Sequence, residues 1–503
     1  MISKKVRPHL LKNVNQFSPT NLNPLKKLFS QTAVYGLSSI IGRLLNYLLV
    51  PLYTGVFNNP ADYGVVSELY AWVAFLIVVL TFGMETSYFR FLQQKENPSE
   101  IFKTSFLTVI GINVLFFLIA LFFNQNIANA LLYPDHNEYI VLLLLIVGID
   151  AISSLPLAKL RYEEKAMKFA GIQFASIGVN IGLNLFFMLV LFNPEQTEEG
   201  VLFILIANLI ASLVKPLFLY KDFLQLRFNI DSDLAKEMIV YALPLVIAGF
   251  AGIINETLDR ILLKQLLYFK DGDLKVATAQ VGIYSAVYKL AMLVSILLQA
   301  YRYAAEPFFF AQAKNQDKNK LYNKMMNYFI ATVCGVFLVV TLNIDIFKHF
   351  IQNESYWVGL GVVPILLLAN VFLGIYYNQS IWYKLSGQTK FGAYIAIGGA
   401  LLTILLNVLF IPTYGFYACA WATLIVYACQ MVASYLLGKK YYPIKYNVRK
   451  FFFYLCTSLL LFWIAKLLDL EGTVTKIVVH NLLLGIYIGL VWMLEVSKKG
   501  VTQ

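Results

Sequence analysis

Long apolar runs recur along almost the whole chain and restrict its fold more than any other feature of the sequence. They extend from Ser30 to Val496, and most contain roughly 20 residues or more, the length that an α-helix needs to cross a hydrocarbon layer about 30 Å thick. Inside lipid the backbone must satisfy its hydrogen bonds internally, which a helix does. The pattern therefore predicts an all-α integral membrane protein with about fourteen transmembrane helices.

The predicted spans fall into three groups behind a basic, polar N-terminal tail at 1–29. Six spans form one lobe at 30–222, six form a second lobe at 234–441, and two are appended at 448–497. We expect the tail to lie in the cytoplasm near anionic head groups. The individual spans are predicted at 30–56, 63–92, 101–123, 138–161, 168–191, 200–222, 234–266, 277–310, 323–350, 356–383, 390–411, 415–441, 448–469 and 475–497.

Composition excludes most soluble classes of protein. Of the 503 residues, 59% are hydrophobic and 14% are charged, which is far too apolar for a soluble chain of this length. The net charge of +12 comes largely from Lys and Arg in short loops beside the apolar runs, so it indicates membrane topology rather than nucleic-acid binding. The four cysteines lie within apolar runs without metal-ligand spacing, and we expect no metal or other cofactor.

The charges of the connecting loops predict which side of the membrane each loop occupies. Loops on the side of the N-terminus are basic, whereas those on the other side are acidic or neutral, as at Asn58–Asp62, Asp135–Glu138 and Pro412–Gly415. Because positive loops stay inside, both termini are predicted to be cytoplasmic and the number of spans to be even. The basic loops contain Lys159, Arg161, Lys165, Lys168, Lys314, Lys318, Lys320, Lys324, Lys439, Lys440, Lys445, Arg449 and Lys450.

A weak internal repeat relates the second predicted span to the eighth. The segments DYGVVSELYAWVAFL and QVGIYSAVYKLAMLV share Gly, Ser and Tyr at one constant offset. Both begin on the outer side, so the similarity indicates a parallel duplication of a six-helix unit, although chance similarity between two aromatic-rich helices is the alternative. Two such bundles would leave a central cavity between them. The matched pairs are Gly64 with Gly282, Ser67 with Ser285 and Tyr70 with Tyr288.

Motifs in both halves of the chain carry a resemblance to a known family. The stretch from Asn58 to Leu92 opens with a Pro-acid-Tyr-Gly turn and closes with a Gly-x-x-Thr-x-x-x-Arg-Phe pattern. The second half contains LDRILLKQLL, VGIYSAVYKLA and QAYRYAAEPFFFAQAKNQD. These motifs resemble those of the polysaccharide transporters in the multidrug/oligosaccharidyl-lipid/polysaccharide (MOP) flippase superfamily, especially its Wzx-type O-antigen flippases. The residues of the first two patterns are Pro60, Asp62, Tyr63, Gly64, Gly83, Thr86, Arg90 and Phe91.

The resemblance implies a two-lobed transporter in the bacterial inner membrane. Its substrate would be an undecaprenyl-pyrophosphate-linked oligosaccharide, such as an O-antigen, capsule or exopolysaccharide repeat unit, which moves to the outer leaflet, often with coupling to a cation or proton gradient. Its partners would be the lipid bilayer, the glycosyltransferases that build the glycan and the polymerase that uses it. The Arg-rich first-helix signature of lipid II flippases is not evident, which disfavours a peptidoglycan precursor.

Two other functions remain as alternatives. A multidrug exporter of the same superfamily handles organic cations, which Arg43, Arg260 and Lys289 would repel. A membrane glycosyltransferase or polysaccharide polymerase would need a sizeable outer loop, but every connection between the predicted spans is short. The chain also contains no P-loop, nucleophile elbow or HExxH motif, so we expect a transporter and not an enzyme.

Cationic side chains within the spans are the candidate substrate ligands, because Arg or Lys at membrane depth is costly unless it faces water or a partner. Arg43 lies near the middle of the first span and would bind a pyrophosphate or sugar, or else brace the helix against a carboxylate. Arg260 would face Arg43 across the cavity, or belong to a self-neutralised cluster. Lys289 is the deepest candidate on the eighth span, whereas Arg302 could bind substrate or pair with Glu306 one turn away.

Carboxylates within the spans are candidates for coupling to a cation or proton gradient. Glu85 and Asp150 could titrate in step with the direction the cavity faces, or could serve as a partner of Arg90 and a helix-bridging acceptor respectively. Glu256 and Asp259 share the seventh span with Arg260 and are further coupling candidates.

Two amides one turn apart on the fifth span complete the candidate site. Asn180 and Asn184 could line the cavity as substrate ligands or bridge neighbouring helices, which is the commoner use of such residues.

Overall fold

The computed structural model describes residues 40–495, except 43, 194–196, 225–229, 314–315 and 469, and over these residues the fold is helical without strands. The N-terminal part contains α2 (Leu49–Val56), α3 (Pro60–Thr81), α4 (Met84–Leu92), α5 (Pro98–Phe122), α6 (Asn124–Ala130), α7 (Asn137–Tyr162), α8 (Ala166–Phe186), η2 (Phe187–Leu191), α9 (Thr197–Phe218) and α10 (Tyr220–Leu224). It is followed by α11 (Ser232–Asp271), α12 (Leu274–Ala311), α13 (Lys318–Leu342), α14 (Ile344–Phe347), η3 (Lys348–Phe350), η4 (Glu354–Val362), α15 (Val363–Gln379), α16 (Ile381–Leu385), α17 (Lys390–Tyr414), α18 (Phe416–Tyr441), α19 (Val448–Leu467) and α20 (Thr473–Glu495).

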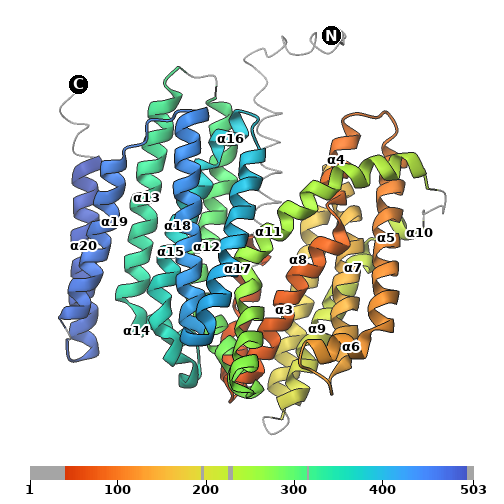
Figure 1. Ribbon diagram of the computed structural model, residues 1–503, viewed down its shortest axis with the longest axis horizontal. Helices are drawn as coiled ribbons and strands as arrows, with labels where there is room; N and C mark the ends of the chain where they lie inside the picture. The colour runs from red at the N-terminus through yellow and green to blue at the C-terminus, as the bar shows by residue number, and fades with distance from the viewer. Residues whose placement is uncertain are drawn as a thin grey trace.

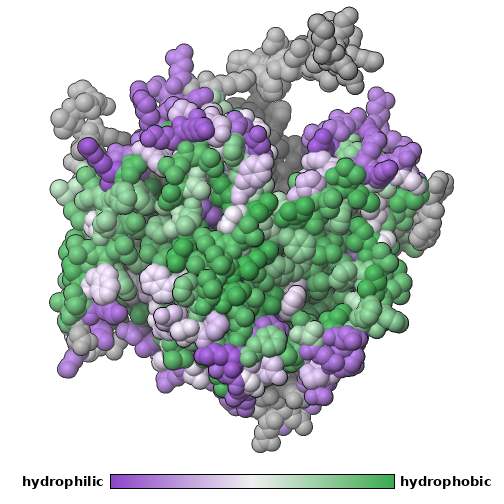
Figure 2. All heavy atoms as spheres, in the orientation of Figure 1, coloured by the Kyte–Doolittle hydropathy of each residue, from purple (hydrophilic) through white to green (hydrophobic). Residues whose placement is uncertain are grey.

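The helices agree with the predicted membrane spans. Among the described residues, 13 helices are long and apolar enough to cross a membrane, and a shorter apolar helix covers Ile40–Val56. The first predicted span, 30–56, lies partly outside the described residues. A broad hydrophobic belt covers the middle of the face in Figure 2, with hydrophilic residues at both ends, as expected for a protein surrounded by lipid.

Short polar side chains determine where several helices begin. The Asn59 side chain accepts a hydrogen bond from the Ala61 amide at 3.0 Å, and Pro60 occupies the first helical position of α3, where its missing N–H costs nothing. Comparable N-caps stand before four other long helices: Asn97 for α5, Asp231 for α11, Asp273 for α12 and Asn447 for α19.

The predicted second span, 63–92, is not one continuous helix. It divides into α3 and α4 because Phe82 and Gly83 both have left-handed backbone conformations, with φ of 47° and 62°. The Asn113 side chain on α5 donates a hydrogen bond of 3.0 Å to the Leu80 carbonyl, near the end of α3. The break lets α4 pack with α5 and the first turns of α11, whereas α3 continues along the centre of the molecule.

The molecule consists of two lobes that diverge toward one end (Figure 1). One lobe contains α3–α9 and the other α12–α18, while α19 and α20 pack beside α13 at the outer edge of the second lobe. The 40-residue α11 connects them, since its first turns contact α4 and α5 and its later part contacts α12 and α17. We call the end where α3 and α12 begin the closed end, and the opposite end the open end.

Two glycines allow α3 and α12 to approach closely at the closed end. A Cβ on Gly64 would lie 2.0 Å from the Thr278 carbonyl oxygen, and a Cβ on Gly282 would lie 1.8 Å from the Pro60 carbonyl oxygen. The two contacts are reciprocal, because one offset of 218 positions relates 64 to 282 and 60 to 278. The glycine pair of the predicted repeat is therefore the point where the two lobes meet about a local twofold relation.

We predict that Gly64→Ala destabilises the closed end. The added methyl group meets backbone rather than a movable side chain, so the expected cost is about 1–3 kcal/mol in the free energy of unfolding. Gly111→Ala on α5 is the matched control, because a Cβ there meets nothing within 4 Å. The control should be neutral or more stable by up to about 1 kcal/mol. Thermal unfolding in detergent compares the two, and equal stability of both variants would contradict the prediction.

Candidate functional site

A cavity of about 1280 Å³ lies between the lobes and is lined by α2, α3, α7, α8 and α9 on one side and by α11, α12, α15 and α18 on the other. On α12 the lining begins at Ser285 and continues to Phe310, one residue before the helix ends. The first turns of α12 are instead occupied by the contact with α3. The cavity therefore extends toward the open end and is closed where Gly64 meets Thr278.

Arg260 on α11 lines the cavity beside its own carboxylate partner. Its guanidinium Nη1 lies 3.2 Å from Asp259 Oδ1 and donates a hydrogen bond of 2.8 Å to the Glu256 carbonyl. The guanidinium carbon is 4.5 Å from the centre of the Tyr288 ring, so α12 also holds the side chain in place. Arg260 is thus fixed in orientation and faces the cavity.

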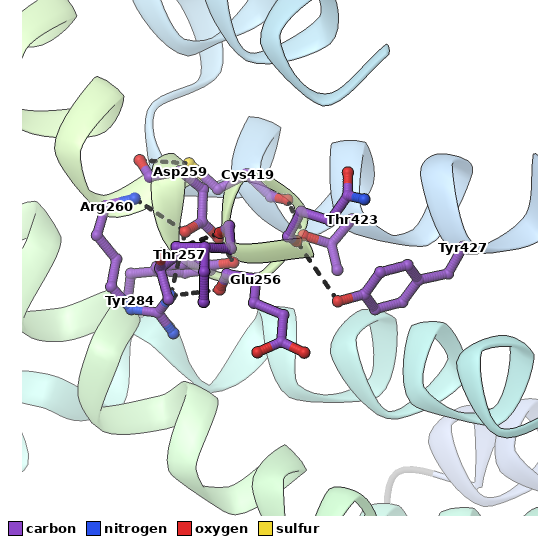
Figure 3. Close-up of polar contacts among 10 residues, drawn as sticks. Glu256, Thr257, Asp259, Arg260, Tyr284, Cys419, Thr423 and Tyr427 are labelled. Atoms are coloured by element: carbon purple, nitrogen blue, oxygen red, sulfur yellow. Dashed lines mark hydrogen bonds and ion pairs between the residues drawn. The ribbon is translucent and has the colours of Figure 1, made fainter. Parts of the chain in front are cut away.

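Asp259 lies behind the cavity wall and does not line the cavity. It is 5% exposed, and its second carboxylate oxygen accepts a hydrogen bond of 2.7 Å from the Tyr284 hydroxyl. Glu256, one turn earlier on α11, does line the cavity. Figure 3 shows its carboxylate pointing away from Asp259 and Arg260. The two carboxylates predicted on this helix therefore occupy different environments.

Lys289 and Arg302 on α12 add two further cations to the wall. Among the described residues, Lys289 has no ion-pair or hydrogen-bond partner. Arg302 lies 3.6 Å from Glu306, as the predicted pairing requires, and stacks 4.5 Å from the centre of the Tyr377 ring. Glu306 also contacts Lys384 at 2.5 Å, so its charge is shared between two cations.

The opposite wall carries an ion pair between α7 and α9. Lys215 Nζ donates a hydrogen bond of 2.7 Å to Asp150 Oδ1, and both residues line the cavity. About two turns earlier on α9, the Asn208 side chain donates a hydrogen bond of 2.6 Å to the Tyr70 hydroxyl on α3. The sequence analysis identified Asp150 but missed Lys215 and Asn208. The sequence feature that could have revealed them is a polar stripe within an apolar run, formed at helical spacing by Asn208, Ser212 and Lys215.

The two predicted amides on α8 separate into a cavity residue and a structural residue. Asn180 lines the cavity, and its side-chain nitrogen is 3.4 Å from the Asn46 side-chain oxygen. Asn184 is 1% exposed, donates to the Asn180 carbonyl and accepts a hydrogen bond of 2.8 Å from the Tyr53 hydroxyl. Asn184 therefore bridges helices. Arg43, the first predicted ligand, lies outside the described residues.

Glu85 has a different partner from the one considered in the sequence analysis. It forms an ion pair of 2.7 Å with Arg161 at the end of α7, and it does not line the cavity. Arg90 instead lies 4.0 Å above the centre of the Tyr241 ring on α11. The Arg90 pairing was wrong because a spacing of five residues within α4 places the two side chains about 140° apart around the helix, so that Glu85 meets α7 and Arg90 meets α11.

The described charged side chains that line the cavity nearly balance. They comprise four cations and three carboxylates, and the contacts above pair most of them within the wall. Among these charges, Lys289 is a cation that forms no ion pair with a described carboxylate. The cations are Lys215, Arg260, Lys289 and Arg302, and the carboxylates are Asp150, Glu256 and Glu306.

Within the described part of the chain, no group of three His, Cys, Asp or Glu side chains could hold a metal ion.

A fully buried ion pair joins the lobes beside the closed end. Glu68 on α3 and Lys264 on α11 contact each other with both side chains 0% exposed. Lys264 also donates to the Leu131 carbonyl at 2.7 Å, and the Tyr133 hydroxyl donates to Glu68 at 2.5 Å. Burial and the adjacent Glu68 carboxylate raise the pKa of Tyr133 far above its usual value, so this hydroxyl keeps its proton. The sequence analysis did not identify Glu68, a fully buried acid on α3.

Comparisons with known proteins agree on the fold. The profile of a family described as "Polysaccharide biosynthesis protein" matches residues 28–312, more than half of the 503-residue chain. The structure is similar to that of the lipid II flippase MurJ in an inward closed conformation, with a TM-score of 0.69, 17% identity, and coverage of 92% of this chain and 98% of that chain. No curated protein sequence matches the chain.

Two multidrug transporter structures are similar as well. One is an inward-facing multidrug resistance MATE family transporter of the MOP superfamily, with a TM-score of 0.60, 15% identity, and coverage of 79% of this chain and 94% of that chain. The other is MATE in the straight conformation, with a TM-score of 0.58, 14% identity, and coverage of 83% and 96%. The chain therefore has the fold of MOP-superfamily transporters, and at these identities the likeness concerns the fold alone.

We predict that Lys264→Met destabilises the protein by about 3–5 kcal/mol, because it leaves the Glu68 charge buried without its partner. Glu68→Gln/Lys264→Met should recover most of this loss, since neither charge then remains. Lys270→Met on the same helix is the control. The Lys270 side chain is 52% exposed and its ion pair with Asp271 is long, at 3.8 Å, so its loss should change the free energy of unfolding little. Unfolding of the purified proteins in mixed micelles compares the variants. Equal stability of Lys264→Met and Lys270→Met would show that the buried pair does not hold the lobes together.

Proposed function

Because the chain belongs to the polysaccharide biosynthesis protein family and has a charged cavity between two lobes, we propose that it is a lipid-linked oligosaccharide flippase. Its substrate is an undecaprenyl-pyrophosphate-linked repeat unit of an O-antigen, capsule or exopolysaccharide. It moves this substrate from the cytoplasmic to the outer leaflet of the bacterial inner membrane by alternating access. It makes and breaks no covalent bond, and the glycosyltransferases that assemble the glycan and the polymerase that consumes it are separate proteins.

The observation that carries this proposal is Lys289, a cation within the cavity that no described residue neutralises. A charge at membrane depth is costly unless it faces water or a partner, so such a side chain favours an anionic ligand. Arg260 and Arg302 lie on the same wall, and both are held in place by aromatic rings. A pyrophosphate would supply the missing negative charge, whereas an organic cation would be repelled by Lys289.

The charges at the two ends support a cytoplasmic position for the open end. Lys159 and Arg161 at the end of α7, Lys439 and Lys440 at the end of α18, and Lys450 at the start of α19 all lie at the open end. Positive loops remain in the cytoplasm, so both termini would be cytoplasmic and the cavity would receive its substrate from that side. Release to the outer leaflet then requires the α3–α12 contact and the Glu68–Lys264 pair to separate.

A coupling carboxylate must exchange its ion with cavity water. Of the predicted candidates, Glu256 and Asp150 line the cavity, and the Glu256 carboxylate points away from the Asp259–Arg260 pair (Figure 3). Asp259 is buried behind the wall, and Glu85 pairs with Arg161 outside the cavity. We therefore assign the coupling to a cation or proton gradient to a carboxylate of the cavity wall, Glu256 or Asp150.

We predict that Lys289→Gln or Arg43→Gln stops most glycan export while the protein still inserts into the membrane. Loss of a charged hydrogen bond, from Lys289 to the pyrophosphate or from Arg43 to a sugar, lowers binding roughly 10- to 100-fold, and export at limiting substrate should fall accordingly. The measurement is the amount of surface glycan in cells that carry each variant, with membrane insertion verified by immunoblotting. Lys466→Gln is the control, because Lys466 is exposed on α19 away from the cavity. Normal export by the Lys289 and Arg43 variants, singly and together, would refute the site.

A further inference from the structure

The two walls of the cavity differ in how their charges are arranged. On the second-lobe wall, Lys289 has no partner among the described residues. The charges that the structure describes on the first-lobe wall, Lys215 and Asp150, form a pair with each other at 2.7 Å. Their side chains are 17% and 30% exposed, so the pair remains accessible from the cavity. The walls therefore present different chemistry to a ligand that occupies the space between them.

The Lys215–Asp150 pair has unused hydrogen-bonding capacity on both partners. An ammonium group has three N–H donors, and Lys215 uses one of them on Asp150 Oδ1. Asp150 Oδ2 has no partner among the residues that the structure describes. The pair consequently offers donors and an acceptor side by side, the combination that two neighbouring hydroxyl groups can use together.

Ser212 lies about one turn before Lys215 on the same stripe of α9 and has a hydroxyl without a described partner. It is 1% exposed and belongs to the cavity wall, and its Oγ forms no hydrogen bond within the described part of the chain. An unsatisfied buried hydroxyl costs free energy, so a ligand group that completes it is favoured. Asn208 continues the stripe and is positioned by its 2.6 Å bond to Tyr70.

This arrangement selects hydroxyl groups over phosphate. A phosphate near the pair would be attracted by Lys215 and repelled by Asp150 at similar distance, so the two effects largely cancel. A sugar hydroxyl can accept from Lys215 while its neighbour donates to Asp150, and both contacts are then favourable. The pyrophosphate instead finds uncompensated charge at Lys289 on the other wall.

The two features also lie at comparable depth. Both α7 and α12 begin at the closed end, at Asn137 and Leu274. A helical rise of about 1.5 Å per residue places Asp150 and Lys289 each roughly 20 Å along its helix. The two features therefore face the cavity at a similar level from its opposite walls.

We propose that the first-lobe wall contains a glycan subsite, formed by Lys215, Asp150, Ser212 and Asn208, which binds uncharged sugar hydroxyls while the second-lobe wall binds the pyrophosphate. This inference rests on the proposed flippase function and adds which part of the substrate each lobe recognises.

The test compares the binding of two probes to the purified protein in nanodiscs. One probe is undecaprenyl pyrophosphate, and the other is the undecaprenyl-pyrophosphate-linked glycan extracted from source cells that lack this transporter. Ser212→Ala removes one neutral hydrogen bond and should weaken binding of the glycan-bearing lipid roughly 3- to 10-fold, whereas the charge-free double variant Asp150→Asn/Lys215→Met should weaken it roughly 10- to 100-fold. Both should leave binding of undecaprenyl pyrophosphate within about twofold of the unmodified protein. Lys289→Gln should weaken the binding of both probes.

Ser153→Ala is the matched control for Ser212→Ala. Ser153 is 0% exposed in the same lobe and also has a hydroxyl without a described partner, but it does not line the cavity. The control should bind both probes normally. The subsite is overturned if the first-lobe variants weaken both probes equally or neither probe, or if the glycan adds no affinity to the unmodified protein. If the unmodified protein binds neither probe, the flippase proposal itself fails.

Discussion

A charged side chain inside a membrane protein must either meet an opposite charge or reach water, and this constraint organises the whole molecule. Glu68 and Lys264 satisfy it through complete burial against each other and against Tyr133 and Leu131. Arg260, Arg302 and Lys215 satisfy it within the cavity wall, each beside a carboxylate. The hydrophobic belt on the surface exists because these charges are directed inward.

The closed end combines close backbone contact with buried charge. Gly64 and Gly282 remove the side chains that would separate α3 from α12, so each helix backbone meets the other directly. The Glu68–Lys264 pair adds a contact between α3 and α11. The direct backbone contact does not allow α3 and α12 to shift sideways past each other. The ion pair is strong only where water is excluded from it. Together they leave the cavity accessible from the opposite end.

The lobes share a repeat in their helices but differ in the side chains that face the cavity. Ser67 and Tyr70 on α3 and their counterparts Ser285 and Tyr288 on α12 all line it. Around them, α7 and α9 contribute the Asp150–Lys215 ion pair, while α11 and α12 contribute the cations Arg260, Lys289 and Arg302 together with the carboxylates Glu256 and Glu306. A related backbone thus presents two different surfaces. The proposed substrate also has two chemically different parts, a neutral glycan and an anionic pyrophosphate, which correspond to the two walls.

The sequence by itself determined the helices, because membrane crossing depends on the apolar character of each segment and helix starts depend on adjacent residues such as Asn59 and Pro60. It also singled out Arg260 and Lys289 as candidate ligands and Asp150 as a candidate coupling carboxylate, since each is a charge within an apolar run, and all three line the cavity. It did not identify the partner of Glu85, the burial of Asp259 or the role of Lys215. Only the tertiary structure decided these, because ion pairs join residues distant in the chain, such as Lys215 and Asp150, 65 positions apart. Hydropathy depends on each segment alone, whereas the partner of a charge depends on how separate helices pack.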